Sequence, residues 1–157
     1  MDEKDLKILS LLARNSQLSL AKIGEQVGLS AEAVRRRIER MVKDGIIKRF
    51  TIEVDLKKLG YNIFVLYRLA INHVSNERIE QFRNFVNNHP NILMHMLTSG
   101  NYDVALLWAF RNDEEYEKTI LDFRTKFNDL IKGKNSSYVL KIYKNLYDAL
   151  ENMLSSY

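Results

Sequence analysis

Two short stretches near the N-terminus alternate apolar and polar positions with the period of an α-helix. The apolar positions are Leu20, Ile23 and Val27 in the first stretch and Val34, Ile38 and Met41 in the second. Between them, Gly28 can adopt the positive φ that ends a helix, and the hydroxyl of Ser30 can cap the next one. Two short helices joined by a glycine turn are typical of a helix-turn-helix, which this pattern predicts over residues 19–44.

A further amphipathic helix is predicted over residues 2–15. Its acidic start suits the positive end of a helix dipole, and Arg14 suits the negative end. The three helices together can bury a small core. The candidates for that core are Leu6, Leu9, Leu20, Ile23, Val27, Leu29, Val34, Ile38 and Met41.

The outer face of the last of these helices is strongly cationic, with four arginines within six residues. A recognition helix places its N-terminal residues on base edges and its later cations on phosphates. We therefore expect Ser30 to start the helix, the next residues to lie near the floor of a DNA groove, and the later arginines to clamp phosphates. The groove residues are Ala31, Glu32, Arg35 and Arg36, and the clamps are Arg37 and Arg40. The alternative is an ordinary solvated face.

The stretch from residue 46 to residue 54 changes to alternating, β-branched residues after Gly45. This pattern predicts a short wing or linker strand, with Lys48 and Arg49 placed to contact DNA phosphates. Residues 55–60 read as a turn-rich hinge. We therefore expect a DNA-binding domain over residues 1–60 and a second domain over residues 61–157.

The second part of the chain reads as strand, helix, strand, strand, helix, strand. The predicted strands cover residues 63–71, 92–98, 102–110 and 138–143, and the predicted helices cover residues 76–88 and 113–131. This βαββαβ order predicts a ferredoxin-like fold, in which two helices cover one face of an antiparallel sheet. The fold class is thus α+β, and a last short helix is predicted over residues 144–157.

The predicted sheet is apolar on both faces, although its helices can cover only one of them. The first strand sets Val65, Tyr67 and Leu69 against Phe64 and Leu66, and the third strand also alternates apolar with apolar residues. An uncovered apolar sheet indicates a protein–protein contact. We therefore expect a homodimer formed through this sheet, with Trp108 at the contact, which would give two DNA-binding domains the symmetry of a palindrome.

The charge distribution agrees with this division. Residues 1–60 hold 13 Lys and Arg against 9 Asp and Glu, whereas residues 61–157 hold 11 of each. The excess of positive charge in the first part favours double-stranded DNA as the partner. The chain has no cysteine, no secretion signal at its start and no apolar run longer than residues 104–110. These features predict a cytoplasmic protein without a membrane partner, cofactor or metal.

With these residues in view, the chain resembles the Lrp/AsnC family of prokaryotic transcription regulators over nearly its whole length. The matching stretches are residues 5–9 (DLKIL), 23–30 (IGEQVGLS), 34–41 (VRRRIERM), 44–47 (DGII), 59–61 (LGY) and 100–103 (GNYD). One departure is the loop after the first helix, where residues 15–18 (NSQL) lack an arginine that the family often carries.

The resemblance implies a winged helix-turn-helix followed by a RAM domain for effector binding and oligomerisation. It also implies a dimer that assembles further, to an octamer or a related ring, and an amino acid or similar small molecule as effector. The positions it implies for effector contact are Thr98, Ser99, Gly100, Tyr102 and Asp103. Asp103 would pair with an α-ammonium group. Alternatively, Gly100 and Asn101 close a hairpin whose turn Asp103 stabilises.

Two other functions need to be weighed. Relatives with this architecture include tetrapyrrole-binding sirohaem decarboxylases, but His73, His89 and His95 are scattered along the chain and no catalytic motif occurs. We therefore expect no enzyme. The other alternative is an architectural protein that coats DNA. Glu32 and Glu39 favour sequence-specific binding, because a carboxylate near phosphates helps only where a particular base is recognised.

Overall fold

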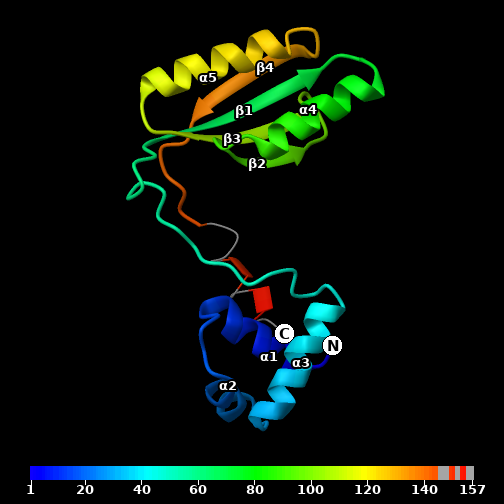
Figure 1. Ribbon diagram of the computed structural model, residues 1–157, viewed down its shortest axis with the longest axis vertical. Coiled ribbons are helices and arrows are strands. Elements are labelled where there is room, and N and C mark those ends of the chain that lie inside the picture. The colour runs from blue at the N-terminus through cyan, green and yellow to red at the C-terminus, as the bar shows by residue number, and fades with distance from the viewer. Residues whose placement is uncertain (145–148, 151–152, 155–157) are drawn as a thin grey trace. The chain divides into compact units, whose positions relative to one another are not determined.

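The structure, a computed structural model (Figure 1), describes residues 1–144, 149–150 and 153–154. The chain divides into two compact units. One consists of Met1–Glu53 and the segment from Ile142 onward, and the other of Val54–Lys141. Of the short helix predicted over residues 144–157, residues 149–150 and 153–154 are helical, and residues 145–148, 151–152 and 155–157 lie outside the described residues.

The first unit contains three helices: α1 (Glu3–Arg14), α2 (Leu20–Val27) and α3 (Ala31–Lys43). Each begins after a side chain that accepts a hydrogen bond from the first turn, namely Asp2, Ser19 and Ser30. The helices enclose a core of Ile8, Ile23, Val27, Val34 and Met41. The helix-turn-helix predicted from the apolar spacing is therefore confirmed.

The turn between α2 and α3 depends on two glycines. Gly28 ends α2 with a left-handed φ of 65°. Gly24 lies inside α2, and its carbonyl oxygen accepts a hydrogen bond from the backbone N–H of Leu29 in the turn (2.9 Å). A Cβ atom on Gly24 would lie 2.4 Å from the carbonyl oxygen of Leu29. The backbone of Leu29 can pack this closely against α2 only because residue 24 has no side chain.

We expect Gly24→Ala to destabilise the first unit by about 1–3 kcal/mol, because backbone must move to admit the methyl group. The sign of this stability change is informative, because Gly→Ala inside a helix otherwise stabilises a protein by about 1 kcal/mol. Urea unfolding followed by circular dichroism at 222 nm measures the change. Glu25→Ala, at the exposed neighbouring position of α2, is the control and should leave stability nearly unchanged.

The strand predicted over residues 46–54 is not formed. After Gly45, with a φ of 72°, the chain continues without helix or strand to a turn at residues 56–60. The alternating Phe50, Ile52 and Val54 side chains remain exposed. A strand exists only where its backbone pairs with another, and no described segment of this chain pairs with residues 46–54. An alternating, β-branched pattern alone therefore does not make a strand here.

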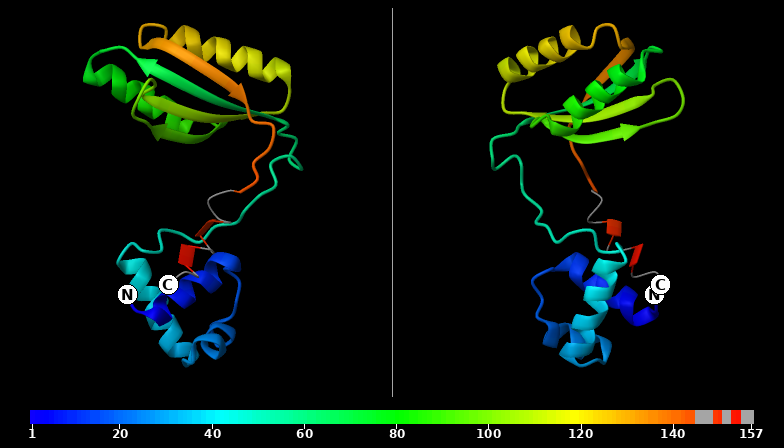
Figure 2. Two further views of the ribbon diagram at one scale, coloured as in Figure 1. Left: turned by 180° about the vertical axis from the view of Figure 1, so that it is seen from behind. Right: turned by 45° about the vertical axis from the view of Figure 1, so that its right-hand side comes forward.

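The second unit has the predicted βαββαβ order (Figure 2). Its elements are β1 (Ile63–Ile71), α4 (Asn76–Asn88), β2 (Ile92–Leu97), β3 (Val104–Phe110), α5 (Asp113–Lys126) and β4 (Ile131–Tyr138). The strands form one antiparallel sheet in the order β2-β3-β1-β4. The α+β fold class is confirmed.

The position of the last strand was predicted wrongly. The sequence pattern placed it at residues 138–143 and extended the preceding helix to residue 131, whereas α5 ends at Lys126 and β4 begins at Ile131. Residues 132–137 (KGKNSS) are polar and include a glycine, so they have weak intrinsic strand preference. Pairing with β1, from Val65–Tyr138 to Ile71–Ile131, decides the strand position instead.

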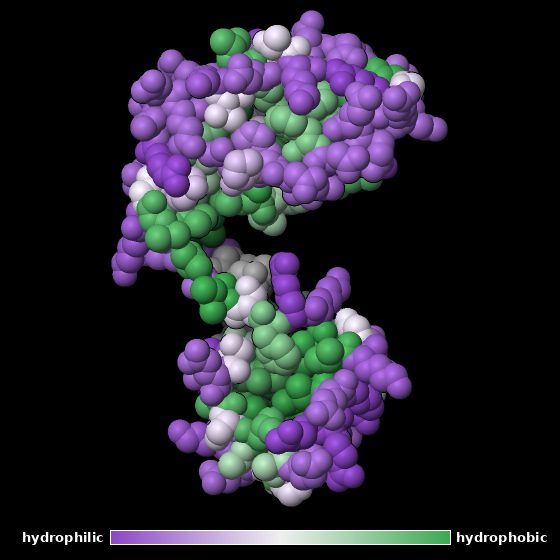
Figure 3. Space-filling view, in the orientation of Figure 1, coloured by the Kyte–Doolittle hydropathy of each residue, from purple (hydrophilic) through white to green (hydrophobic). Residues whose placement is uncertain are grey.

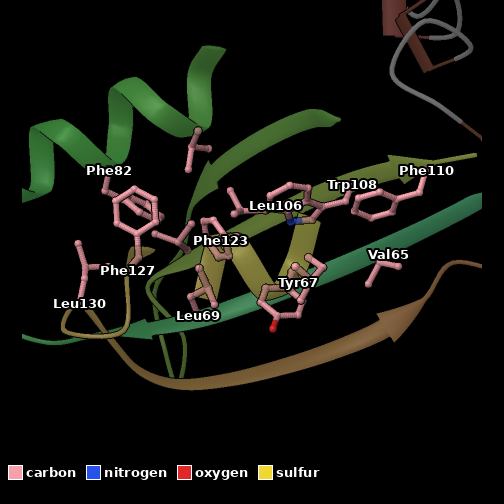
Figure 4. Packing of buried hydrophobic residues seen from close by; sticks show 13 residues of the cluster. Val65, Tyr67, Leu69, Phe82, Leu106, Trp108, Phe110, Phe123, Phe127 and Leu130 are labelled. Atoms are coloured by element: carbon pink, nitrogen blue, oxygen red, sulfur yellow. The ribbon is translucent and has the colours of Figure 1, made fainter. Parts of the chain in front are cut away.

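One face of the sheet carries the core of the second unit (Figure 4). Val65, Tyr67 and Leu69 of β1 and Leu106, Trp108 and Phe110 of β3 pack there against aromatic residues of the two helices, such as Phe82 and Phe123. Trp108 is fully buried in this core. The expectation that Trp108 lies at a dimer contact is therefore wrong, because strand parity alone did not say which face the helices cover.

The other face of the sheet carries no helix. Its side chains alternate with the core residues and are Phe64, Leu66, Arg68 and Ala70 on β1, and Ala105, Leu107 and Ala109 on β3. On β1 and β3 the face is apolar except for Arg68, and on the neighbouring β4 it carries the polar residues Asn135 and Ser137. Its Nε atom is buried without a hydrogen-bond partner among the described residues, while its Nη2 donates weakly to Ser137 Oγ at 3.4 Å. This set is called the open sheet face below.

Candidate functional site

The exposed face of α3 is the candidate DNA-reading surface. The hydroxyl of Ser30 accepts a hydrogen bond from the backbone N–H of Ala33 (3.2 Å), which fixes the start of the helix. Ala31, Glu32, Arg35 and Arg36 are all exposed, and hydrophilic residues predominate along α3 on the face shown in Figure 3. These side chains are held outward because Val34 and Met41 are anchored in the core.

The two exposed arginines differ in their surroundings. Arg35 lies beside Glu32, with 3.6 Å between Nε and Oε2. Arg36 forms no ion pair or hydrogen bond with any residue that the structure describes. Arg36 is therefore available to an external acceptor in the N-terminal half of α3, and the Arg35–Glu32 pair can present a donor and an acceptor side by side.

Arg37 and Arg40 have internal partners that the sequence analysis missed. Arg37 Nη1 lies 2.7 Å from oxygens of both Asp2 and Asp5, and Arg40 Nη2 lies 2.7 Å from the second oxygen of Asp5. Asp5 is almost fully buried, whereas Arg40 remains about half exposed, at 52%. These arginines fasten α3 to the start of α1. Their expected role as phosphate clamps stays a prediction.

The contacts within this cluster lower the pKa values of both carboxyl groups. The Arg37 guanidinium holds the pKa of the Asp2 carboxyl below its ordinary value. Burial by itself would raise the pKa of Asp5, but hydrogen bonds from the Asp2 backbone N–H and from Arg37 outweigh it and lower that pKa. The sequence did hold a signal: Asp5 stands one helical turn before Ile8, on the inward stripe of α1, where an acid requires a partner.

Lys48 and Arg49 are exposed in the extended segment that follows α3. The structure places them outside any helix or strand, so their side chains have no regular element to orient them. Both remain candidates for contact with DNA phosphates.

The loop between β2 and β3 holds the candidate effector residues. The backbone N–H of Thr98 donates to the carbonyl oxygen of Asp103 (2.8 Å), and its hydroxyl donates to the carbonyl oxygen of Tyr102 (2.7 Å). Gly100 occupies the turn with a φ of 114°. One carboxylate oxygen of Asp103 accepts from the backbone N–H of Ile71 (2.7 Å). Asp103 thus stabilises the end of the hairpin against β1, while Ser99 and Gly100 are exposed.

The three histidines do not form a site together. The ring of His89 contacts Phe85 and Trp108, and the ring of His95 contacts Phe82 and lies 2.8 Å from the side-chain oxygen of Asn87. Burial lowers the pKa of both. His73 is exposed after β1. Within residues 1–144 and the short described pieces beyond, there is no group of three or more metal-ligating side chains.

Comparison with known families assigns both units. Residues 1–42 match the AsnC-type helix-turn-helix domain, and residues 65–148 match the Lrp/AsnC ligand binding domain. The transcriptional regulator AzlB of Bacillus subtilis is 31% identical over 144 residues, which cover 92% of this chain and 91% of AzlB. The regulator Zrp of Zymomonas mobilis is 39% identical over 120 residues, covering 74% and 76% of the two chains.

Solved structures agree. An AsnC family regulator from Agrobacterium tumefaciens superposes with a TM-score of 0.85 at 27% identity, covering 92% of this chain and 94% of that one. A transcriptional regulator from Neisseria meningitidis, solved in complex with L-Met, has the same fold with a TM-score of 0.85 at 24% identity, covering 92% and 93%.

A helix-turn-helix unit joined to an α+β ligand-binding unit defines a class of DNA-binding transcription regulators. Within that class, this chain belongs to the Lrp/AsnC family. No helix in the described part of the chain is long and apolar enough to cross a membrane.

Proposed function

We propose that this regulator binds palindromic promoter sites as a homodimer, with α3 of each copy in the major groove. The observation that carries the proposal is the exposure of Arg35 and Arg36 on the outer face of a helix whose start is fixed by Ser30. The N-terminal half of such a helix reads base edges, whereas cations further along contact the backbone. Ala31 and Glu32 complete the reading surface, and Arg40, Lys48 and Arg49 contact phosphates.

We expect Arg36→Ala to weaken binding to a specific site about tenfold or more, because a bidentate arginine–guanine contact contributes about 1–3 kcal/mol of discrimination. A gel shift with the DNA upstream of the protein's own gene, repeated at several salt concentrations, measures the loss. Lys7→Ala, which removes an exposed cation of α1, is the control. If the two variants bind alike, α3 is not the reading helix.

The dimer is proposed to form through the open sheet face. Leu66 and Leu107 lie opposite each other on this face, surrounded by Phe64 and the small side chains of Ala105 and Ala109. An uncovered apolar sheet is expected to pair with a second copy of itself, which places two α3 helices under one two-fold axis. Assembly of such dimers into an octamer or a related ring is part of the same proposal.

We propose an amino acid or a related molecule as the effector, at the loop of Thr98, Ser99, Gly100, Tyr102 and Asp103. The second carboxylate oxygen of Asp103 accepts no hydrogen bond from the residues that the structure describes, and Ser99 and Gly100 are exposed. The Neisseria relative that was solved with L-Met supports this class of ligand. A thermal-shift screen of the amino acids tests it, and Ser99→Tyr should abolish any shift that depends on this loop.

The competing function is an architectural protein that coats DNA with little sequence preference. Glu32, which lies beside Arg35 in the middle of the reading surface, favours a sequence-specific protein, because its carboxylate would repel a bare phosphate. Footprinting separates the two functions. Half-sites protected about one helical turn apart indicate a regulator, and uniform protection indicates coating. We propose no enzymatic activity and no cofactor.

A further inference from the structure

A recess at the end of α5 gathers positive charge that no described group neutralises. It has a volume of about 150 Å³ and is lined by Arg124, Asn128, Ile131, Lys132, Gly133 and Lys134. Three of these residues are cationic and none is acidic. Arg124, Lys132 and Lys134 form no ion pair with any residue in the described part of the chain. Asp129, the acid next to Asn128 in sequence, is bonded to Arg78 at 2.8 Å.

The crowding of these cations has an energetic consequence. Burial lowers the pKa of Lys134, and the positive charge of Arg124 lowers it further. Neighbouring like charges repel, and an anion bound between them would relieve the repulsion. Cations at a helix C-terminus also complement the helix dipole, which accounts for Arg124 on α5. It does not account for Lys132 and Lys134, because both belong to β4.

The strand that supplies these lysines departs from ordinary strand composition. β4 is an edge strand, and its first half contains a glycine between two lysines. Lys132 is the extra residue of a bulge, since Ala70 pairs with Gly133 and Ile71 with Ile131. Bulges at sheet edges often aim a side chain at a site. A polar, bulged strand that disobeys its local preferences is where a functional constraint is expected.

A second recess of about 300 Å³ adjoins the first and shares Arg124 and Asn128 with it. Its other lining residues are Leu121 and Thr125, and the Leu121 side chain is 63% exposed. The two recesses therefore place the apolar side chain of Leu121 next to the cationic lining. A ligand that fits both has an anionic group and a short apolar remainder.

We propose that this recess binds a small anion carrying a carboxylate or phosphate group and no ammonium group. Arg124 provides a planar donor that matches two oxygens of such a group, and Lys132 and Lys134 supply further charge. An amino acid fits poorly, because no lining residue is an acid that would pair with its ammonium group. No residue of the β2–β3 loop lines this recess, although Asp103 of that loop is bonded to Ile71, which pairs with the lining residue Ile131.

Calorimetric titration of the full chain tests the proposal at constant ionic strength. The probes are inorganic phosphate and the matched pair 2-oxobutanoate and 2-aminobutanoate. We expect phosphate and 2-oxobutanoate to bind and 2-aminobutanoate to bind about tenfold more weakly. Arg124→Gln with Lys134→Gln should weaken phosphate binding about tenfold or more, since each lost charge-assisted bond removes a large part of the affinity.

Lys118→Gln is the control, because it removes one exposed cation of α5 that lines neither recess. Equal weakening by this variant would mean unspecific charge attraction and would overturn the proposal, as would the absence of any binding. A gel shift of the same variants gives a separate reading. If the double variant loses DNA affinity without any change in anion binding, the recess contacts the DNA backbone and the proposal is wrong.

Discussion

Leu66→Lys is expected to prevent the proposed dimer from forming while the second unit stays folded. Leu66 lies on the open sheet face, opposite Leu107, and points away from the core that Val65 and Tyr67 help to form. In a monomer the new ammonium group reaches water at no great cost. In the dimer it would be buried among apolar side chains, which costs several kcal/mol because no acid lies on that face to pair with it.

The loss of the dimer should also reduce DNA binding. Two linked DNA-binding units gain about 10²–10⁴ in affinity over one unit, because the second contact becomes intramolecular. Light scattering gives the mass, and a gel shift gives the affinity. Leu66→Met, which keeps the face apolar and of similar volume, should preserve both. A dimer that survives the lysine would show that the copies meet elsewhere.

Trp108→Arg gives the contrasting result. It introduces a charge into the closed core, where Trp108 stacks near Phe110 and contacts Phe123 edge-on. We expect this variant to unfold the second unit, so a loss of assembly in it would say nothing about the dimer surface. The comparison of positions 66 and 108 therefore separates the two faces of the sheet by experiment.

Much of the fold could be predicted because its signals are local. Signals that act within one or two helical turns determine the helix-turn-helix. They are the apolar spacing of Ile23, Val27 and Val34, the caps at Ser19 and Ser30, and the glycine at position 28. The span of α4 follows from its pattern for the same reason. These local preferences agree with the final structure, as is usual in sequences that fold cooperatively.

The errors concern interactions between distant segments. The position of β4 depends on its pairing with β1, 60 residues earlier at the pair of Ile71 with Ile131 and 73 residues earlier at the pair of Val65 with Tyr138. The composition of β4 itself argues against a strand. The face on which Trp108 lies depends on where the two helices pack. The sequence did not predict the ion pairs of Arg37 and Arg40 with Asp5, which lies more than 30 residues away and was expected only to complement the helix dipole. The spacing of residues along the sequence does not predict these long-range contacts.

The buried carboxylate of Asp5 leads to the second large effect. Asp5→Asn keeps the shape of the side chain but removes the charge that Arg37 and Arg40 both contact at 2.7 Å. We expect the first unit to lose about 2–3 kcal/mol of stability, because hydrogen bonds to charged groups are among the strongest and the arginines would lose a shared acceptor. Glu3→Gln removes an exposed acid from the same helical turn and is the matched control.

Two optical signals separate the units in this experiment. The only tryptophan of the chain, Trp108, lies in the second unit, so its fluorescence follows that unit alone. Circular dichroism at 222 nm also follows the helices of the first unit. In a urea titration, Asp5→Asn should shift the circular dichroism transition to lower urea and leave the fluorescence transition in place. A shift of both transitions, or of neither, would contradict the role assigned to this cluster.

The same cluster sets a pH dependence whose direction follows from the lowered pKa values of Asp2 and Asp5. Both carboxyls titrate below 3.8, the ordinary value, in the folded protein, whereas in the unfolded chain they titrate near it. The unfolded state therefore takes up protons first as the pH falls. The stabilisation is complete above the unfolded pKa and is lost as the pH falls through the folded values.

Because Asp5→Asn has already lost the Asp5 contribution, its stability should fall less steeply than that of the wild type between pH 5 and about pH 2, as the acid range of this linkage requires. Parallel curves for the two proteins would mean that the ion pairs with α3 add nothing to the stability of the DNA-binding unit.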